Sequence, residues 1–306
     1  MDIVCNFDNT YVRYASVMLV SLFENNLNEE INVHVLYKNL IEENQHKLST
    51  LVQKYQGKHI HFYRINPDRI MTFPIDGNPY ITMDAYLRLF MAEVIPQEVD
   101  KVLYLDCDLI VDGSLRDLWN TDVSDVALAS VEDFNCRSES NYVRLCYSQT
   151  DNYFNSGVLL VNLSYLREID FTQKAVDYIS KYPERVKFSD QDVLNALLHD
   201  RKKLLPYRYN VQDMFLRRKQ KNRTQAEKDL LRRECAHPVI IHFSGCRKPW
   251  RCDGHNPYNK LWYKYQDMTP WASQRPRMPF WYRWRKRLDA VLEFLYLRQR
   301  KYVSVR

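Results

Sequence analysis

The chain has 306 residues, of which 45% are hydrophobic and 27% are charged. This length and composition predict a folded protein with a sizeable core and exclude a wholly disordered chain. The net charge of +6 is concentrated at one end, because residues 275–306 carry ten Lys or Arg and two acids, whereas residues 1–274 carry 34 basic and 36 acidic residues. A nearly neutral body argues against nucleic acid as a partner.

Short apolar runs alternate with amphipathic stretches along most of the chain. We expect strands at 3–7, 31–37, 59–65, 102–105, 126–131, 156–163 and 238–244, and helices at 11–25, 42–55, 84–94, 164–182 and 190–199. Strand–helix alternation with nearly continuous apolar strands predicts an α/β domain on a mostly parallel sheet. Such sheets bind ligands beyond the carboxyl ends of their strands, and there we expect Asp8, Asp106 and His242.

Residues 213–236 interrupt this pattern with a highly charged, helix-prone segment. A solvated surface helix is one interpretation, and a mobile lid or an acceptor-binding insertion is the other. We therefore divide the chain into a main α/β domain at 1–252, which contains this insertion, and a basic, aromatic C-terminal tail at 253–306.

The sequence also bears on the compartment. The N-terminal segment MDIVCNF has an acid at position 2 and no long apolar stretch, so we expect no secretory signal. Seven cysteines without a C-x-x-C pair predict reduced thiols in a cytosol. No run of 18 apolar residues occurs, so no membrane-spanning helix is expected.

The spacing of the six glycines excludes two nucleotide-binding motifs. Neither G-x-G-x-x-G nor G-x-x-x-x-G-K-[ST] is present, so a nucleotide would bind without a dinucleotide fingerprint or a P-loop. A bound diphosphate would then need another source of positive charge, and a divalent cation held by carboxylates would supply it.

Two carboxylates, Asp106 and Asp108, follow directly after the apolar run at 102–105. Two residues apart in an extended chain, they project to the same side. Hard oxygen ligands of this kind suit Mg²⁺ or Mn²⁺, but the motif is short, and turn capping is the alternative. A second D-x-D at Asp190 and Asp192 illustrates how common the pattern is.

His242 strengthens the metal interpretation because it ends an apolar run and precedes Gly245 and Lys248. An imidazole beside two carboxylates favours Mn²⁺ over Mg²⁺. Gly245 permits close backbone approach, and Lys248 offers an ammonium group to a phosphate. A rival is structural zinc, for which the same region holds candidate ligands at Cys235, His237, His242, Cys246, Cys252 and His255, although their spacing fits no zinc motif.

For four further residues, the sequence alone is explained by an ordinary structural role. Arg88 fits an exposed helical arginine, Asn155 and Asp190 fit helix or turn caps, and Gln191 is unremarkable.

Taken together, these residues resemble the family-8 glycosyltransferases, retaining enzymes that include bacterial lipopolysaccharide galactosyl- and glucosyltransferases and glycogenin. The resemblance runs from Met1 to about Trp250 and rests on five blocks in order: IVCNFDNTY (3–11), YLRL (86–89), VLYLDCDLIV (102–111), FNSGVLLVNL (154–163) with SDQDVLN (189–195), and HFSGCRKPW (242–250).

The resemblance implies a GT-A fold, a UDP-hexose donor and a saccharide or lipid-linked saccharide acceptor. In this family Mn²⁺ is held by the D-x-D aspartates and the late histidine, here Asp106, Asp108 and His242. The remaining roles it implies are uridine binding by Asp8 and Tyr11, diphosphate binding by Gly245 and Lys248, and contacts to the donor sugar by Arg88, Asn155, Asp190 and Gln191. Thr10 departs from the amide or acid of some relatives, which weakens the uridine assignment.

Retention at C1 requires either a covalent intermediate or front-face attack, in which the leaving phosphate takes the proton of the acceptor. A covalent intermediate would need Asp190 or Gln191 to reach the β-face of C1, and an amide such as Gln191 is a weak nucleophile. Front-face attack is therefore favoured, with Asp190 and Gln191 positioning the sugar.

The C-terminal tail is aromatic, basic and amphipathic. Its apolar residues recur at helical spacing, at Trp281, Trp284, Leu288, Val291, Leu292 and Leu295. This pattern favours a helix in an anionic membrane interface, and a helix docked on the body is the alternative. A lipid-linked acceptor would explain the anchor, so we expect a cytoplasmic protein that is peripheral at the inner face of the membrane.

Two rival functions remain open from the sequence. A haloacid-dehalogenase-type phosphatase also carries a D-x-D at the end of a strand. However, its motif requires Thr or Val at the position where this chain has Ile110, and the acid pair that follows downstream in such phosphatases is missing. A non-catalytic protein that binds a nucleotide sugar is the other rival.

Overall fold

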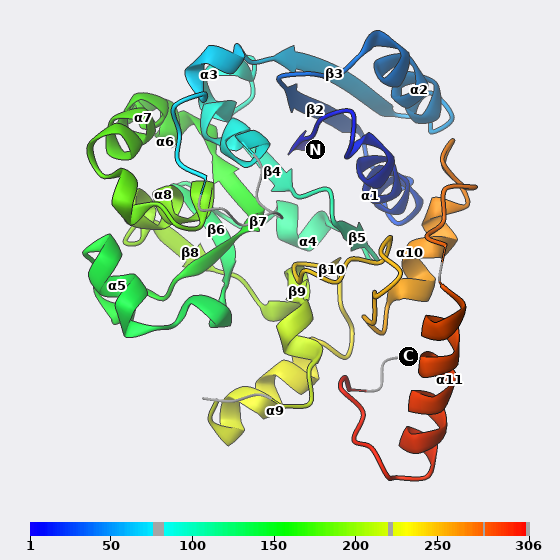
Figure 1. Cartoon of the computed structure of the whole chain (residues 1–306). Coiled ribbons are helices and arrows are strands. Elements are labelled where there is room, and N and C mark those ends of the chain that lie inside the picture. Colours follow the sequence, from blue (N-terminus) through cyan, green and yellow to red (C-terminus); the bar gives the residue numbers. More distant parts are fainter. Residues whose placement is uncertain (76–82, 220–222, 278, 304–306) are drawn as a thin grey trace.

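The computed structural model describes residues 1–75, 83–219, 223–277 and 279–303, and its centre is a seven-stranded sheet (Figure 1). The strand order is β3-β2-β1-β4-β7-β6-β8. The strands are β1 (Asp2–Asn6), β2 (Ile31–Tyr37), β3 (Lys58–Arg64), β4 (Lys101–Leu105), β6 (Leu128–Glu132), β7 (Phe154–Asn162) and β8 (Lys202–Leu204).

Four of the six strand pairings are parallel, and only the two that β7 makes, with β4 and β6, are antiparallel. Residues Val102 to Leu105 of β4 are at most 1% exposed, as expected for a strand covered on both faces. The mostly parallel α/β sheet predicted from the sequence is therefore confirmed.

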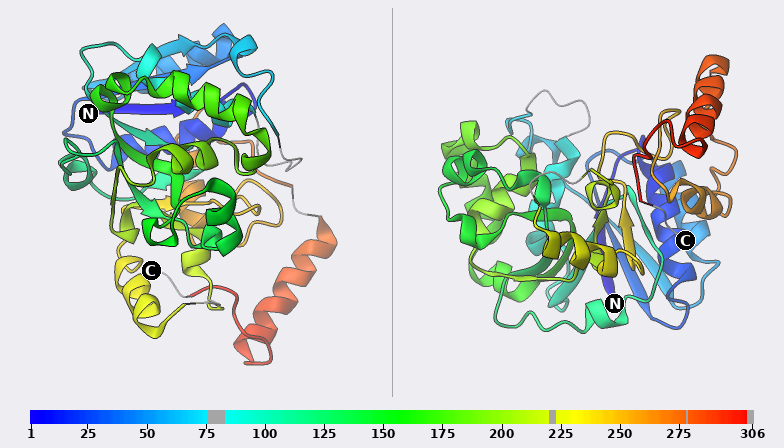
Figure 2. Two further views of the ribbon diagram at one scale, coloured as in Figure 1. Left: turned by 90° about the vertical axis from the view of Figure 1, so that its left-hand side faces the viewer. Right: turned by 90° about the horizontal axis from the view of Figure 1, so that it is seen from below.

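Helices cover both faces of this sheet (Figure 2). Each face has its own apolar core. One layer contains α1 (Val12–Glu24), α2 (Glu42–Val52) and α10 (Asn259–Gln266). The other contains η2 (Met83–Phe90), α3 (Met91–Val94), α6 (Leu163–Glu168), α7 (Phe171–Lys181) and α8 (Ser189–Leu198). Shorter pieces are η1 (Pro67–Arg69), α4 (Arg116–Trp119), η3 (Phe134–Cys136), α5 (Glu139–Leu145), η4 (Gln149–Asp151), η5 (Pro183–Arg185) and η6 (Tyr207–Tyr209).

A second sheet of three strands lies beyond the carboxyl end of β4, in the order β5-β10-β9. Its strands are β5 (Leu109–Val111), β9 (Val211–Gln212) and β10 (Ile240–His242). The expectation that the strand at 238–244 belongs to the central sheet is wrong. β10 instead pairs antiparallel with β5, and His242 lies opposite Leu109, which carries the histidine to the residues that follow β4.

Two of the expected helices are subdivided. The stretch at 84–94 is a 3₁₀ helix, η2, that continues into the α-helical turn α3. The stretch at 164–182 forms α6 and α7, because Asp170 between them adopts a left-handed conformation with φ 50°, which ends a right-handed helix.

The charged segment at 213–236 contains η7 (Asp213–Leu216) and α9 (Gln225–Glu234), while its residues 220–222 lie outside the described part. Thr224 and Glu227 form a reciprocal capping box at the start of α9, which satisfies two backbone N–H groups. Leu231 is buried against the larger core, and Glu227 pairs with Arg137 at 2.6 Å.

The C-terminal region has two parts that differ in packing. In α10, Trp262 and Tyr265 are at most 2% exposed and join the main core, so the boundary drawn at residue 252 falls inside a packed region. In contrast, α11 (Phe280–Phe294) stands away from the body (Figures 1 and 2). Residues 278 and 304–306 of the tail lie outside the described residues. Within the described parts, no helix combines the length and apolarity needed to cross a bilayer.

Candidate active site

A cavity of about 370 Å³ opens beyond the carboxyl ends of β1 and β4, beside the amino end of the antiparallel strand β7. Ten of the eleven residues selected from the sequence line it, and the exception is Gly245. The lining carries six carboxylates against two cationic side chains, Arg88 and Lys248; the carboxylates are those of Asp8, Asp84, Asp106, Asp108, Asp133 and Asp190. A polyanionic ligand would be repelled here unless additional positive charge enters with it.

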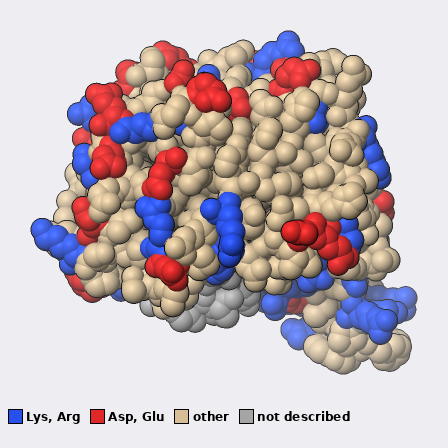
Figure 3. Space-filling view, turned by 90° about the horizontal axis from the view of Figure 1, so that it is seen from above, with Lys and Arg blue, Asp and Glu red and all other residues tan. Residues whose placement is uncertain are grey.

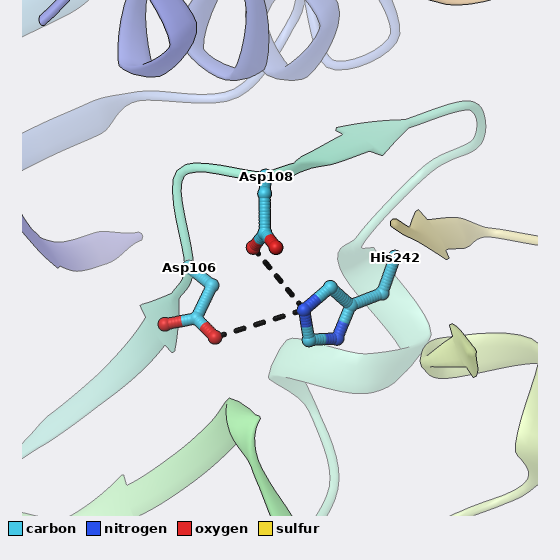
Figure 4. A group of neighbouring side chains, drawn as sticks. All are labelled: Asp106, Asp108 and His242. Carbon is cyan, nitrogen blue, oxygen red and sulfur yellow. Dashed lines mark ion pairs between the residues drawn. The ribbon is translucent and has the colours of Figure 1, made fainter. Parts of the chain in front are cut away.

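Asp106, Asp108 and His242 converge at this cavity (Figure 4). Their ligand atoms all lie within 4.8 Å of one another. His242 Nε2 is 3.2 Å from Asp108 Oδ1 and 3.7 Å from Asp106 Oδ2. The aspartates follow β4, and the histidine ends β10, so the antiparallel pairing of β5 with β10 brings the three together.

A chain of hydrogen bonds fixes which nitrogen of His242 carries the proton. Asn155 Oδ1 accepts from the backbone N–H of Gly157 at 3.0 Å and from Asn210 Nδ2 at 2.8 Å. Asn210 must therefore direct its Oδ1, an acceptor, at His242 Nδ1, 3.0 Å away. The proton of neutral His242 then sits on Nδ1, and its Nε2 lone pair faces two carboxylates.

Three electron-rich groups that face one another without a proton between them repel, unless a cation is shared among them. Two carboxylate oxygens and one imidazole nitrogen are suitable ligands for Mn²⁺ or Mg²⁺. The donor set therefore fits a divalent cation.

Gly157 on β7 is required for this convergence, although the sequence analysis did not select it. A Cβ at this position would lie 2.7 Å from Asp106 Oδ2 and still closer to His242 Cε1. Only glycine leaves room for both ligands. A glycine inside the otherwise apolar run FNSGVLLVNL is the sequence signal that marks such a close approach.

Lys248 reaches into the site from the loop after β10. Its ammonium group pairs with Asp108 and donates to Phe243 O at 2.8 Å. Burial alone would raise the pKa of Asp108, but the ammonium group of Lys248 holds it well below its usual range. Asp108 is therefore ionised at any physiological pH, as a metal ligand must be.

Arg88 is buried rather than exposed. Its Nη1 donates to Ser156 O at 2.6 Å and its Nη2 to Asp106 Oδ1 at 2.9 Å, while its guanidinium lies over the ring of Tyr104. Burial disfavours the charge, yet Asp106 and Asp190 raise the pKa of Arg88. The interpretation of Arg88 as a solvated helical arginine is wrong; it holds Asp106 in place.

Asp190 and Gln191, at the start of α8, differ in their free hydrogen-bonding capacity. Gln191 Oε1 accepts from Asn155 Nδ2 at 3.1 Å and from the backbone N–H of Ser156 at 3.0 Å, so both its lone pairs are engaged. Asp190 Oδ2 is buried and has no hydrogen-bond partner. Burial raises the pKa of Asp190 to about 6, against the attraction of Arg88.

Asp133 and Ser156 are cavity residues that the sequence analysis missed. Asp133 Oδ2 accepts from Asn155 Nδ2 at 3.2 Å and from Gln191 Nε2 at 3.3 Å. Asn155 therefore connects Asp133, Gln191 and Asn210, which makes it the centre of the network and more than a turn cap. Asp133 lies in no recognisable motif, and Ser156 lies in the block FNSGVLLVNL without having been singled out; the packing of β6 beside β7 brings the two segments together.

At the other end of the cavity, Asp8 caps the turn that precedes α1. Its Oδ1 accepts the backbone N–H groups of Thr10 and Tyr11, each at 2.9 Å. Its Oδ2 has no hydrogen-bond partner among the described residues. Tyr11 is half-buried and meets Trp250 edge-on at 6.3 Å. Gly245 lies outside the cavity lining and against Asp213, 3.3 Å from where its Cβ would be.

The zinc alternative does not assemble. Within the described residues, the single cluster of three or more His, Cys, Asp or Glu ligands is Asp106, Asp108 and His242. Cys235 is buried in the main core, and His255 contacts Tyr282 instead.

Comparison with known proteins agrees with this geometry. The model of the family "Glycosyl transferase family 8" matches residues 2–254. General stress protein A of Bacillus subtilis is 28% identical over 89% of this chain and 94% of its own length. A lipopolysaccharide 1,2-glucosyltransferase of Escherichia coli is 28% identical over 87% of this chain and 78% of its own.

Among solved structures, the galactosyltransferase LgtC in complex with donor and acceptor sugar analogues superposes with a TM-score of 0.78 at 28% identity. The match covers 92% of this chain and 99% of LgtC. An active-site mutant of LgtC gives a TM-score of 0.80 at 27% identity. These likenesses confirm the GT-A fold expected from the sequence.

Family model, fold and site thus agree over most of the chain. The resemblance drawn from the five sequence blocks is confirmed: this chain belongs to glycosyl transferase family 8, whose members transfer a sugar from a nucleotide-sugar donor to an acceptor.

Proposed function

We propose that the chain is a retaining hexosyltransferase that moves glucose or galactose from a UDP-sugar to a saccharide acceptor of lipopolysaccharide or another cell-surface glycan. The observation that carries the proposal is the convergence of Asp106, Asp108 and His242 in an acidic cavity of a family-8 fold. Relatives named lipopolysaccharide 1,2-glucosyltransferase and lipopolysaccharide 1,3-galactosyltransferase support the class of donor sugar and acceptor.

Asp106, Asp108 and His242 would hold Mn²⁺, with Mg²⁺ as the alternative. The imidazole ligand favours Mn²⁺. When bound, the ion supplies positive charge that neutralises the donor diphosphate and the UDP leaving group. Asn210 and Arg88 keep the histidine and Asp106 in place, by the hydrogen bonds described above.

The nucleotide end of the donor would lie along Asp8 and Tyr11. Asp8 Oδ2 is free to accept from the uracil edge, and the ring of Tyr11 offers a stacking face. Lys248 would exchange its contact with Asp108 for a phosphate oxygen, with Gly245 in the same loop permitting close backbone approach. These side chains and the loop would together bind the UDP part of the donor without a glycine-rich phosphate-binding motif.

At the sugar end, Arg88, Asn155, Asp190 and Gln191 would surround the hexose. Asp190 Oδ2 accepts no hydrogen bond, although it lies 3.0 Å from Arg88 Nε, and is available to accept from a sugar hydroxyl; a buried acceptor of this kind discriminates strongly between sugars. Both lone pairs of Gln191 Oε1 are engaged, so attack by this oxygen on C1 would first break two hydrogen bonds.

This favours front-face attack over a covalent intermediate on Gln191. In front-face attack, the bond from C1 to the phosphate oxygen breaks, the acceptor hydroxyl oxygen bonds to C1 on the same face, and its proton passes to the leaving phosphate. Asp190 and Gln191 then act by orienting the hexose.

The rival functions lack support. A haloacid-dehalogenase-type phosphatase would use a D-x-D aspartate as nucleophile, but Asp106 is held by Arg88 and the fold is that of a glycosyltransferase. A non-catalytic sugar-binding protein has no need for the complete set of charged groups in the cavity.

We further propose that the tail associates with an anionic membrane from the cytoplasmic side, with α11 as its contact. Trp281, Trp284 and Leu288 of this helix are 64%, 59% and 57% exposed. Seen from above, both signs of charge are mixed over the body, whereas mainly Lys and Arg accompany uncharged residues on the projecting C-terminal part (Figure 3). Aromatic side chains beside cations favour the bilayer interface, where a lipid-linked acceptor would be met.

The test of the proposed activity is a screen for UDP release. The purified chain is incubated with UDP-glucose, UDP-galactose and their N-acetyl forms, with Mn²⁺, with Mg²⁺ and with a chelator. We expect release from one hexose donor in the presence of a divalent cation. Absence of release from every donor, or release that is unchanged by chelation, would overturn the proposal.

A further inference from the structure

A second, larger cavity lies away from the active site, between α11 and the body. Its volume is about 680 Å³, which is within the range of small-molecule sites. None of its lining residues lines the active-site cavity. The two cavities meet at one loop, where Lys248 faces the metal site and its neighbour Arg247 faces the second cavity.

Contacts at both ends of α11 enclose this space. Near its start, the Tyr282 hydroxyl lies 3.2 Å from His255 Nε2. Beyond its end, the chain turns back at Tyr296, which has φ 58°, and Tyr302 forms an antiparallel bridge with Arg217. The Tyr302 side chain is 9% exposed, and its hydroxyl donates to Asp213 Oδ1 at 2.9 Å.

The cavity is strongly cationic. Eight of its lining residues are Lys or Arg and three are acidic; the cations are Arg217, Lys219, Arg247, Arg285, Lys286, Arg298, Arg300 and Lys301. Arg217 pairs with Asp213, and Arg298 pairs with Asp289. The other six have no carboxylate partner within the described part of the chain. Burial lowers the pKa of Lys301, and the nearby Arg247 and Arg217 lower it further, which is the behaviour of a site with too few anions.

The ligand class follows from this chemistry. Guanidinium groups bind phosphate oxygens with paired hydrogen bonds, and ammonium groups add point charge. The diphosphate of the donor is not the ligand of this cavity, because it is proposed to bind in the active-site cavity, which Lys248 faces. The apolar face of α11 is exposed and available to a membrane, whereas this basic face is turned toward the body.

We infer that this cavity binds a phosphate ester carried by the acceptor, so that the acceptor is a phosphorylated saccharide. The inference rests on the proposed function, because it concerns the second substrate of that reaction. Its placement suits the purpose: Arg247 adjoins Lys248, and Asp213, which holds Tyr302, also lies against Gly245. A phosphate anchored here leaves the attached saccharide beside the donor loop.

The test compares two double variants with the same loss of charge. Arg285→Gln with Lys301→Gln removes two exposed cations of the cavity, and Arg283→Gln with Arg287→Gln removes two exposed cations of α11 outside it. Glucose 6-phosphate is the soluble probe and glucose its control, titrated calorimetrically into the full chain with a chelator present. Without metal, the acidic active-site cavity repels the probe. Thermal unfolding verifies that the variants are folded.

We expect saturable binding of glucose 6-phosphate but not of glucose, weakened at least tenfold in the Arg285/Lys301 variant and unchanged in the Arg283/Arg287 variant. Equal binding by both variants, or no saturable binding by the wild type, would overturn the inference. A separate arm uses phosphatidylcholine vesicles with and without phosphatidylglycerol. If the Arg285/Lys301 variant alone loses vesicle binding while glucose 6-phosphate fails to bind the wild type, the occupant is a lipid headgroup and the inference is wrong.

UDP release by the wild-type chain is measured in parallel, without acceptor. Release with no binding of glucose 6-phosphate refutes the phosphate site and leaves the proposed function standing. Binding of glucose 6-phosphate without UDP release from any donor refutes the proposed function and leaves only a phosphate-binding site.

Discussion

The guanidinium of Arg88 and the carboxylate of Asp190 are both buried and lie 3.0 Å apart, yet they form no hydrogen bond. Arg88 donates its Nε–H to Ala85 O at 3.1 Å, so Asp190 Oδ2 gains Coulomb attraction without a bonded proton. The protein thus keeps a charged, unsatisfied acceptor in its sugar-binding cavity, at a cost in stability.

This relationship predicts that Asp190→Asn stabilises the metal-free protein while it impairs sugar transfer. The folded-state pKa of about 6 lies above the ordinary value of 3.8 for an aspartate, so at pH 7.5 the folded state bears the penalty of an ionised Asp190. From about 1.4 kcal/mol per pKa unit, the gain is on the order of 1–3 kcal/mol. Chemical denaturation with a chelator, at several pH values, measures it.

The sign of the pH dependence is specific. A carboxyl whose folded pKa is raised destabilises the fold above that pKa, and the effect disappears once both states are protonated. The advantage of Asp190→Asn is therefore full above about pH 6, declines as the pH falls toward 3.8, and vanishes below it. A variant that is less stable than the wild type at pH 7.5 would contradict this account.

Gly157→Ala tests the packing of the metal ligands. The new Cβ would lie 2.7 Å from Asp106 Oδ2, so one ligand must move. We expect at least tenfold weaker Mn²⁺ binding and a loss of stability of about 1–3 kcal/mol, measured by metal titration and thermal unfolding. Gly113→Ala is the control, since its Cβ would meet its nearest neighbour at 3.6 Å. Equal metal affinity in the two variants would refute the role of Gly157.

The hydrogen bond between His242 and Asn210 predicts a second effect on metal affinity. Asn210→Leu keeps the volume but removes the acceptor of the Nδ1 proton, and we expect Mn²⁺ to bind 10–100-fold more weakly. Asn210→Asp keeps the acceptor of the Nδ1 proton but loses the hydrogen bond to Asn155 Oδ1, so it should bind Mn²⁺ more tightly than the leucine variant. The histidine assignment is wrong if the leucine variant binds Mn²⁺ as the wild type does.

Membrane association is tested by substitutions that leave the core intact. Trp281→Ser, Trp284→Ser and Leu288→Ser alter exposed side chains of α11, so stability should change little, while sedimentation with anionic vesicles should be largely lost. The matched control replaces Leu27, Met71 and Val143, which are 60%, 68% and 70% exposed on the body, by serine. Vesicle binding that persists in the α11 variant would exclude the helix as the contact.

The sequence predicted the central sheet well, because β4 and β7 each contain a continuous apolar run, at 102–105 and 158–161, and β2 alternates clearly. It misplaced β10, since the run PVIIH is apolar whichever sheet it joins, and only its pairing with the short strand β5 decides the matter. The break between α6 and α7 depends on one residue, Asp170, that adopts a left-handed conformation without being glycine.

For the active site, the sequence identified residues that lie in short motifs but not residues that act through hydrogen-bond networks of the folded protein. Asp106 and Asp108 form a recognisable pair, and His242 opens a distinctive block. Asn210 and Asp133, by contrast, act through hydrogen bonds to side chains far along the chain, and no spacing rule connects them. Arg88 was given a role by resemblance alone, because a sequence does not reveal that a helical arginine is buried.

The central claim is that the three converging ligands hold a divalent cation required for cleavage of a UDP-hexose. The most direct measurement is UDP release by the wild type and by Asp108→Asn, before and after chelation and with Mn²⁺ restored. We predict release by the wild type that falls at least 100-fold on chelation and returns with Mn²⁺, and a similar loss in the variant that Mn²⁺ does not reverse. Release that is indifferent to chelation, or an Asp108→Asn variant with wild-type activity, would contradict the account.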